Sequence, residues 1–319
     1  LAMVAMFESA RLETKLARLL EAFEAERIPL VLLKGAGIAL QRRGTLRGRP
    51  MRDLDVLLDP ADVHRAFALA RTLGWIDSRY AGDAPFYEVA AHLAPLEDDG
   101  GSQLQLELHS DLFFAGHPFG LTAAMVRAQA VPVTWRGHRV GVPDQTRLIL
   151  HAALHASWSH ALRGAWWRSW HDVAPLLPTS DEGWTALTND ALAARAGTSL
   201  YWLLRLGRAL TGMAVPETVL ATLGVPIPAL LRPLLFAHIT GDACALVQSS
   251  PSVKLNKLAW RLALQPVASG HGAQTPWQYE ALGGFSSHEG EALSPMRKLQ
   301  YHLRRWRVYL SYGRRVILR

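Results

Sequence analysis

The chain has 319 residues, of which 50% are apolar and 19% are charged, and its formal net charge is +7. This composition excludes a disordered or fibrous chain, and the length favours two globular domains that each bury a core. The positive charge favours phosphate-bearing partners, whether nucleotide, nucleic acid or anionic membrane, and says nothing about the fold. The single cysteine, Cys244, cannot form an internal disulfide, which favours a reducing, cytoplasmic location.

The N-terminal residues predict a helix and no signal peptide. Residues 7–26 place apolar side chains at helical spacing with charges between them, which is typical of an amphipathic helix packed on a sheet. The charges, beginning with Glu8, argue against a signal peptide. The longest apolar run, near Leu30, contains Lys34 and is too short to span a bilayer, so no transmembrane segment is expected.

A strand, a glycine-rich turn and a short helix are predicted next. Residues 28–33 form a short, β-branched apolar run, which indicates a buried strand. Gly35 and Gly37 permit a tight exit from this strand and a close approach of the backbone to a ligand. Residues 36–43 predict a short helix, and its free N–H groups beside Lys34 would suit a phosphate.

Two aspartates open the following apolar run, Asp53-Leu54-Asp55-Val56-Leu57-Leu58. On a strand, residues i and i+2 point to the same face, so both carboxylates would lie a few ångströms apart. Like charges at that distance repel each other, and a divalent cation removes the repulsion. The pair therefore predicts one side of a metal site.

A helix and two turns are predicted between this strand and the next. Asp59-Pro60-Ala61-Asp62 is a helix start, and the helix over residues 63–73 is expected to end at Gly74. Residues 82–85 and 97–101 are rich in glycine and predict turns. The acidic second turn is interpreted as a solvated hairpin tip in preference to a metal loop.

Residues 102–109 alternate cleanly between polar and apolar side chains, which predicts a half-buried strand. If this strand lies beside the strand of Asp53, Glu107 on its polar face completes a site of three carboxylates. Three hard oxygen donors together with substrate phosphates suit Mg²⁺. Asp111 is the alternative third ligand.

The second half of the chain is predicted to be mainly helical. Residues 131–142 indicate a hairpin with its turn at Arg136-Gly137, and Pro143-Asp144 then begins a helical region. We therefore expect a domain boundary here, with residues 1–142 as one domain and 143–319 as the other.

Histidines in the second half suggest two competing interpretations. His151 and His155 have the i, i+4 spacing of a zinc pair, but residue 152 is alanine where a metalloprotease carries glutamate. A metal phosphohydrolase would combine one of these histidines with His171-Asp172 and Asp190. The simpler interpretation places His151 and His155 at the interface with the first domain, where they could contact substrate.

Residues 295–319 predict a basic amphipathic helix. They contain eight arginines and lysines, no acidic residue, and apolar residues between the charges. Such a helix binds RNA, binds an anionic membrane, or exposes one charged face to solvent. All three alternatives stay open.

The order of these features resembles the polymerase-β nucleotidyltransferase superfamily. LLKGAG, RPMRDLDVLL and LELHSDL, within residues 28–112, are similar to its uncharacterised bacterial "nucleotidyltransferase family" branch. Better-known members carry Gly-Ser where this chain has Lys34-Gly35, so the nucleotide contacts are expected to differ in detail. The resemblance implies an α+β fold with a small mixed sheet and flanking helices, followed by a mainly helical domain.

The resemblance also implies an activity, a Mg²⁺-dependent transfer of a nucleotidyl group from an NTP to an unknown acceptor with release of pyrophosphate. Asp53 and Asp55 would bridge two Mg²⁺ ions, with Mn²⁺ as the alternative, and Glu107 would bind the ion nearer the acceptor and act as general base. The expected nucleotide contacts are Lys34, Gly35, Arg49 and Arg52, and the candidates on the acceptor side are His109, His151 and His155. Addition of nucleotides to tRNA ends and a catalytically silent nucleotide-binding scaffold remain the alternatives.

Overall fold

The computed structural model describes residues 2–47, 51–78, 91–100, 104–114, 117–162, 168–224, 227–239, 259–260 and 262–264. The chain divides into two compact units. Unit 1 holds Leu1–Ala152 and Asp172–Thr179, and unit 2 holds Ala153–His171 and the chain from Ser180 onward. The domain boundary expected after residue 142 stays a prediction.

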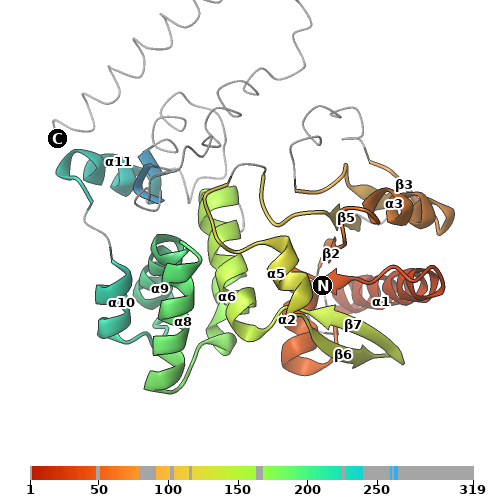
Figure 1. Cartoon of the computed structure of the whole chain (residues 1–319), viewed down its shortest axis with the longest axis horizontal. Helices are drawn as coiled ribbons and strands as arrows, with labels where there is room; N and C mark the ends of the chain where they lie inside the picture. Colours follow the sequence, from red (N-terminus) through yellow and green to blue (C-terminus); the bar gives the residue numbers. More distant parts are fainter. Residues whose placement is uncertain are drawn as a thin grey trace, which may run out of the picture. The chain divides into compact units, whose positions relative to one another are not determined.

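Unit 1 is built on a mixed sheet with the strand order β3-β4-β5-β2-β1-β7-β6 (Figure 1). β1 pairs with β7 and β2 pairs with β5 in parallel, whereas the other neighbouring strands are antiparallel. The strands are β1 (Val31–Leu32), β2 (Asp53–Leu57), β3 (Trp75–Asp77), β4 (Leu96–Asp98), β5 (Gln105–His109), β6 (Val131–Trp135) and β7 (His138–Val142). The predicted α+β fold with a mixed sheet is confirmed.

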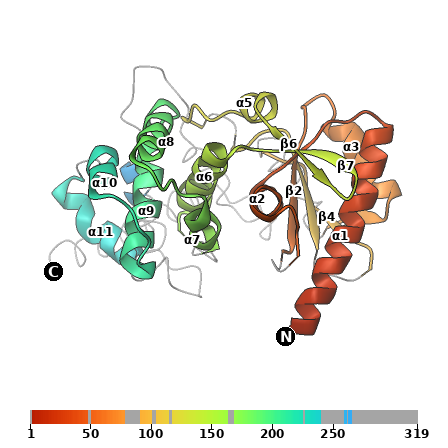
Figure 2. The same cartoon turned by 90° about the horizontal axis from the view of Figure 1, so that it is seen from below.

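Helices α1 (Ala2–Ala25) and α3 (Val63–Thr72) cover one face of this sheet (Figure 2). The helical spacing of apolar residues in α1 buries one stripe of the helix, Leu12, Leu16, Leu19 and Phe23. This stripe packs with Leu54 and Val56 of β2 and Leu106 and Leu108 of β5 in a common core. Because residues alternate along a strand, the same packing leaves the acidic residues of β2 and β5 on the opposite face.

The first strand is shorter than predicted. Residues 28–33 were expected to be extended, but β1 comprises only Val31–Leu32. The reason is that α1 closes its C-terminal end with hydrogen bonds from Arg27 N to Glu24 O (3.1 Å) and from Ile28 N to Phe23 O (2.8 Å). The backbone at Arg27 is left-handed, with φ 56°, so the chain reverses there before it can enter the sheet.

Three further local predictions for unit 1 are confirmed: the glycine after α3, the turn of the β6–β7 hairpin and the helix start at Asp144. Gly74, with φ 82°, follows α3, and the hairpin β6–β7 turns at Arg136 (φ 50°) and Gly137 (φ 86°) as a two-residue turn with both φ positive. Asp144 begins α6 (Gln145–Leu154) by accepting a hydrogen bond from Arg147 N (2.9 Å). Among the described residues, this unit also contains α2 (Lys34–Arg43), α5 (Ala123–Ala128) and a 3-10 helix at Ala174–Leu176.

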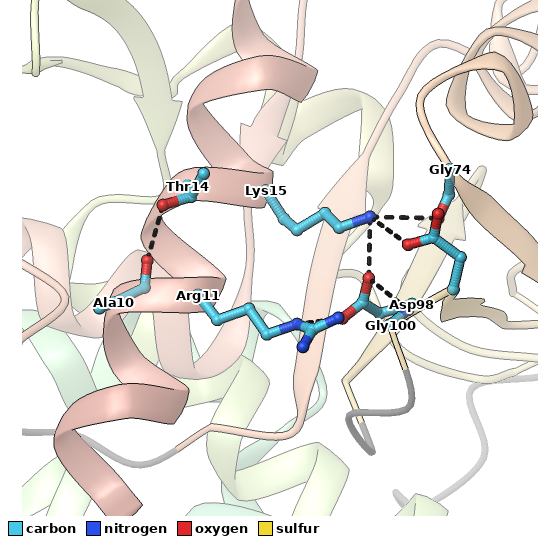
Figure 3. Close-up of polar contacts among 8 residues, drawn as sticks. Ala10, Arg11, Thr14, Lys15, Gly74, Asp98 and Gly100 are labelled. Atoms are coloured by element: carbon cyan, nitrogen blue, oxygen red, sulfur yellow. Dashed lines mark hydrogen bonds and ion pairs between the residues drawn. The ribbon is translucent and has the colours of Figure 1, made fainter. Parts of the chain in front are cut away.

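The acidic segment at residues 97–101 lies at the tip of the antiparallel β4–β5 hairpin, as predicted, and Asp99 and Gly100 form an exposed turn, but the segment is not solvated throughout. Its first residues belong to β4, and Asp98 is buried. Figure 3 shows Arg11 and Lys15, one turn apart on α1, reaching Asp98, with Lys15 Nζ 2.8 Å from its Oδ1. Lys15 Nζ also lies 2.9 Å from Asp99 Oδ1. The aspartates therefore fix α1 to the end of β4.

Unit 2 is helical in its described residues, as predicted. α8, α9 and α10 lie side by side (Figures 1 and 2). The helices of this part of the chain are α7 (Arg168–Val173), α8 (Asp181–Ala193), α9 (Gly197–Thr211), α10 (Glu217–Leu223) and α11 (Arg232–Ala237), with a π-helix at His155–Ser159. None of the described helices is long and apolar enough to cross a membrane. The turn predicted at 82–85 and the basic helix predicted at 295–319 lie outside the described residues.

Candidate active site

The carboxylates of β2 and β5 meet on one face of the sheet. The two strands run parallel, and their register places Asp53 opposite Gln105 and Asp55 opposite Glu107. Side chains of paired residues in neighbouring strands point to the same side, so Asp53, Asp55 and Glu107 share a face. The prediction that these two strands lie side by side is therefore confirmed.

Lys34 lies directly at these carboxylates. Leu33 N donates to Asp55 O (3.0 Å), so the residue that follows begins α2 beside Asp55. Lys34 Nζ is 2.6 Å from Asp55 Oδ1 and 3.5 Å from Glu107 Oε2. The backbone of Lys34 has φ 42°, a conformation that costs a residue with a side chain about 1 kcal/mol. The surrounding fold thus holds a strained residue with its ammonium group between two acids.

His109 contacts the same two carboxylates as Lys34. Its Nε2 is 3.0 Å from Asp55 Oδ1 and 3.4 Å from Glu107 Oε2, and its side chain is buried. The alternation of residues 102–109 places His109 on the same strand face as Glu107, but the sequence analysis predicted a contact with the acceptor and not with the carboxylates. The signal for a closer role was the i, i+2 spacing from Glu107 at the end of a strand.

His92 was missed by the sequence analysis. It forms an isolated β-bridge with His109, and the centroids of the two rings are 4.9 Å apart. His92 Nδ1 lies 2.7 Å from the carbonyl oxygen of Leu93. Burial and the charge of His109 lower the pKa of His92. No motif marks this histidine in the sequence.

The four charged groups shift one another's pKa values. Burial opposes ionisation of Asp55 and Glu107, but Lys34 and the hydrogen bonds from His109 lower the pKa of both carboxyl groups, that of Glu107 well below its ordinary value. Burial also opposes the charge on Lys34 and on His109, yet the two acids raise the pKa of each. Asp53 differs, because burial and the charge of Asp55 raise its pKa. Asp55, Glu107 and Lys34 are therefore ionised at neutral pH.

The residues present fit a divalent cation. Asp55, Glu107 and His109 each offer a ligand atom, and these atoms lie within 4.8 Å of one another. Carboxylate oxygens suit Mg²⁺, and an imidazole nitrogen beside them also suits Mn²⁺. The ammonium group of Lys34 between the two acids shows that a cation fits there. No other such group of three occurs among the described residues.

The other predicted site residues have different positions. Asp53 begins β2 at an exposed position, and Arg52, also exposed, precedes it. Gly35 is the second residue of α2. Asp111 accepts a hydrogen bond from Leu112 N (2.7 Å) and does not belong to the group of three, whereas Arg49 lies outside the described residues.

The histidine pair of the zinc interpretation is divided between the two units. His151, in unit 1, is buried, with its ring centroid 5.8 Å from that of Phe113. His155, in unit 2, lies in the π-helix, with its Nε2 3.2 Å from Nε2 of His160. His151 and His155 as acceptor contacts therefore stay predictions.

His151 predicts a pH dependence of stability. Burial, together with the nearby charges of Lys34 and His109, lowers the pKa of His151 to about 3. The unfolded chain, where a histidine has a pKa of about 6.5, takes up a proton below that pH that the folded protein does not, so this contribution to stability is lost as the pH falls from about 6.5. Replacing His151 with leucine should reduce the stability lost between pH 7 and pH 5 by about 2 kcal/mol.

The measurement is the free energy of urea unfolding of both proteins at the two pH values. Because the opposite contribution of His109, whose pKa is raised, is present in both, it cancels in the difference. His64→Leu, at an exposed position of α3, controls for the loss of a histidine as such. Equal losses in wild type and His151→Leu would mean that His151 is charged in the folded protein.

The chain is similar to a known protein family and to a solved structure. No curated protein matches this chain. The solution structure of the antibiotic-resistance factor ANT(2'')-Ia is similar over 59% of this chain and 94% of its own, with 16% sequence identity and a TM-score of 0.39, a likeness too low to support any argument. Residues 4–212, about two thirds of the chain, match a family model described as uncharacterised nucleotidyltransferase. This match supports nucleotidyl transfer as the class of reaction. The chain therefore belongs to the family of uncharacterised nucleotidyltransferases.

Proposed function

We propose that this protein is a Mg²⁺-dependent enzyme that transfers a nucleotidyl group from an NTP to an acceptor hydroxyl or phosphate and releases pyrophosphate, a reaction of the EC 2.7.7 type. The observation that carries the proposal is the pairing of Asp55 with Glu107 on adjacent parallel strands, with Asp53 on the same face. The family match supports the same class of reaction. A reducing, cytoplasmic location stays a prediction from the single cysteine.

The carboxylates would hold the metal. When bound, the ion would neutralise the triphosphate and activate the acceptor oxygen. Asp53 and Asp55 would be its ligands on the nucleotide side and Glu107 on the acceptor side. Glu107 is also the proposed general base, but the contacts with His109 and Lys34 lower its pKa. A base works best with a pKa near the working pH, so the basic role requires that these contacts loosen when substrate binds.

The start of α2 is the proposed phosphate site. Free N–H groups at a helix N-terminus favour an anion, and Lys34 and Gly35 are the first two residues of this helix. Arg52, exposed before β2, would add a charge on the nucleotide side, and Arg49 would do the same. The acceptor is a small molecule, a peptide or an RNA end, and the reaction chemistry is the same for each.

The direct test is transfer of label from α-labelled NTPs. Each of the four NTPs, with Mg²⁺ or Mn²⁺, is incubated with the protein and either total RNA, a protein extract or a small-molecule extract, and pyrophosphate release is measured in parallel. Glu107→Gln should lower the rate by about a hundredfold or more, because it removes a charged ligand and the base. Glu97→Gln, on the neighbouring strand β4, is the matched control and should keep the wild-type rate.

The fraction that takes up label identifies the class of acceptor. Label in RNA would favour action on tRNA ends. Binding of an NTP without label transfer or pyrophosphate release in every combination would contradict the proposal and favour a silent scaffold.

A further inference from the structure

The acids of the candidate active site have fewer cationic partners than the other buried acid cluster of unit 1. Unit 1 contains a comparable cluster at the end of β4, where Arg11 and Lys15 face Asp98 and Asp99, two cations against two acids (Figure 3). At the candidate active site one lysine, Lys34, faces Asp53, Asp55 and Glu107. The first cluster is complete as a structural ion pair network, whereas the second has room for further positive charge.

Lys34 occupies the position that a bridging cation would take. Its Nζ touches the carboxylates of two adjacent strands, 2.6 Å from Asp55 Oδ1 and 3.5 Å from Glu107 Oε2. A divalent ion bound to these acids at about 2 Å would lie within a few ångströms of the ammonium group. Two cations at that distance repel strongly in a partly buried site. The ion and the lysine head therefore compete for the same oxygens.

Lys34 also has an alternative place for its charge. It is the first residue of α2, so its flexible stem starts beside the free N–H groups proposed to bind the triphosphate. Only side-chain torsions need to change to carry the ammonium group from the acids toward a phosphate. The ammonium group of Lys34 can therefore reach either the carboxylates of Asp55 and Glu107 or a bound triphosphate.

We propose that Lys34 is the internal counter-ion of Asp55 and Glu107, that a divalent ion displaces it from them, and that the released ammonium group then binds the triphosphate. This inference rests on the metal site of the proposed function. It makes Lys34 a positioning residue that links metal binding to nucleotide binding.

The test is binding of Mn²⁺ alone, without nucleotide, measured by electron paramagnetic resonance. Lys34→Met keeps most of the volume of the stem and removes the charge, so it should bind Mn²⁺ about tenfold more tightly than wild type or better. Lys34→Arg keeps the charge and should not gain affinity. Lys15→Met removes a lysine that is also largely buried and pairs with acids in unit 1, and it should leave Mn²⁺ affinity unchanged.

Nucleotide binding should change in the opposite direction. With Mg²⁺ present, Lys34→Met should bind a non-hydrolysable NTP about tenfold more weakly, because the triphosphate loses a cation. A residue that only stabilised the fold would lower both affinities together. Lys34→Gln is the second variant if Lys34→Met does not fold, and the rise in melting temperature on adding Mn²⁺ is the second readout, larger in the variant than in wild type.

Mn²⁺ affinity that is equal or weaker in both uncharged variants would overturn the inference. The measurement needs no turnover, so its result is separate from that of the transfer assay. Tighter Mn²⁺ binding in the variant without transfer in wild type would support the role of Lys34 and contradict the proposed function. Transfer in wild type with unchanged Mn²⁺ affinity in the variants would support the proposed function and contradict the role of Lys34.

Discussion

Asp53→Asn and Asp55→Asn are both expected to abolish nucleotidyl transfer, yet to affect the stability of the empty protein differently. Each substitution removes a proposed metal ligand, so the rate should fall by about a thousandfold or more. If the acids only repelled each other, both variants would be as stable as wild type or slightly more stable. The contacts of Asp55 change this expectation for one of the two positions.

Asp55 is buried and carries two partners. Lys34 Nζ lies 2.6 Å and His109 Nε2 3.0 Å from its Oδ1. Asparagine keeps the shape and loses the charge, which leaves two buried cationic groups with Glu107 as their nearest acid. Breaking a buried ion pair at one partner costs about 3–5 kcal/mol, and the remaining contact with Glu107 should keep the loss near the lower end.

Asp53 lies in the opposite situation. Although Asp53 lies at an exposed position, desolvation by the surrounding atoms and the charge of Asp55 raise the pKa of its carboxyl group, so its ionised form is less favourable than in water. Asparagine removes that charge at an exposed position, and the melting temperature should stay the same or rise slightly. The charge of Asp53 therefore does not stabilise the fold, which is expected of a residue that serves to bind a cation.

Melting temperatures without metal and pyrophosphate release with Mg²⁺ and NTP together test this pair of expectations. Asp77→Asn, an exposed acid on β3 that pairs with Arg71, is the control and should change neither quantity much. Retained transfer in either site variant would remove that aspartate from the site. A stable Asp55→Asn protein would mean that Lys34 and His109 find other partners.

The strands of the site could be predicted because periodicity carried the information. Alternation in residues 102–109 and the i, i+2 aspartates identify the faces of two strands without any knowledge of their partners. Their adjacency came from the resemblance, and the register of Asp55 with Glu107 confirms that they are neighbours. Local pattern and family order together were sufficient for this part.

The contacts within the site could not be predicted in the same way. Lys34 was expected to face phosphate because it precedes a helix, and the left-handed backbone that turns it to Asp55 has no signature in a residue other than glycine. His92 reaches His109 through an isolated bridge between distant segments. Such positions depend on tertiary packing, which no short pattern encodes.

Asp98 shows the same limit at the end of β4. Its neighbours in sequence are acidic or glycine, which is typical of a solvated turn. Its ion pairs come from Arg11 and Lys15, more than eighty positions earlier in the chain. A buried acid is recognised only when its partners are known.

Gly37→Ala is expected to destabilise unit 1 severely, more than a typical glycine substitution in a helix. A Cβ at Gly37 would lie 2.3 Å from the carbonyl oxygen and 3.2 Å from the carbonyl carbon of Leu32. These are backbone atoms of β1, so no side chain can move aside to make room. Overpacking of this kind costs about 1–3 kcal/mol and more where the backbone must shift.

The same contact bears on the site, because it sets how closely α2 approaches the strand that precedes it. Gly37 N donates to the carbonyl oxygen of Leu33 (3.0 Å), the residue before Lys34, so a displaced helix would carry the lysine away from Asp55.

Gly44→Ala is the matched control. Gly44 ends the same helix at φ 62° with open space around its Cβ position, so alanine there brings only backbone strain of about 1 kcal/mol. Thermal melting of both variants, with Mn²⁺ binding measured on whatever Gly37→Ala protein folds, separates the two effects. A Gly37→Ala protein that melts no lower than Gly44→Ala would show that α2 can shift without loss, and that the tight contact between helix and strand is not what holds Lys34 at the acids.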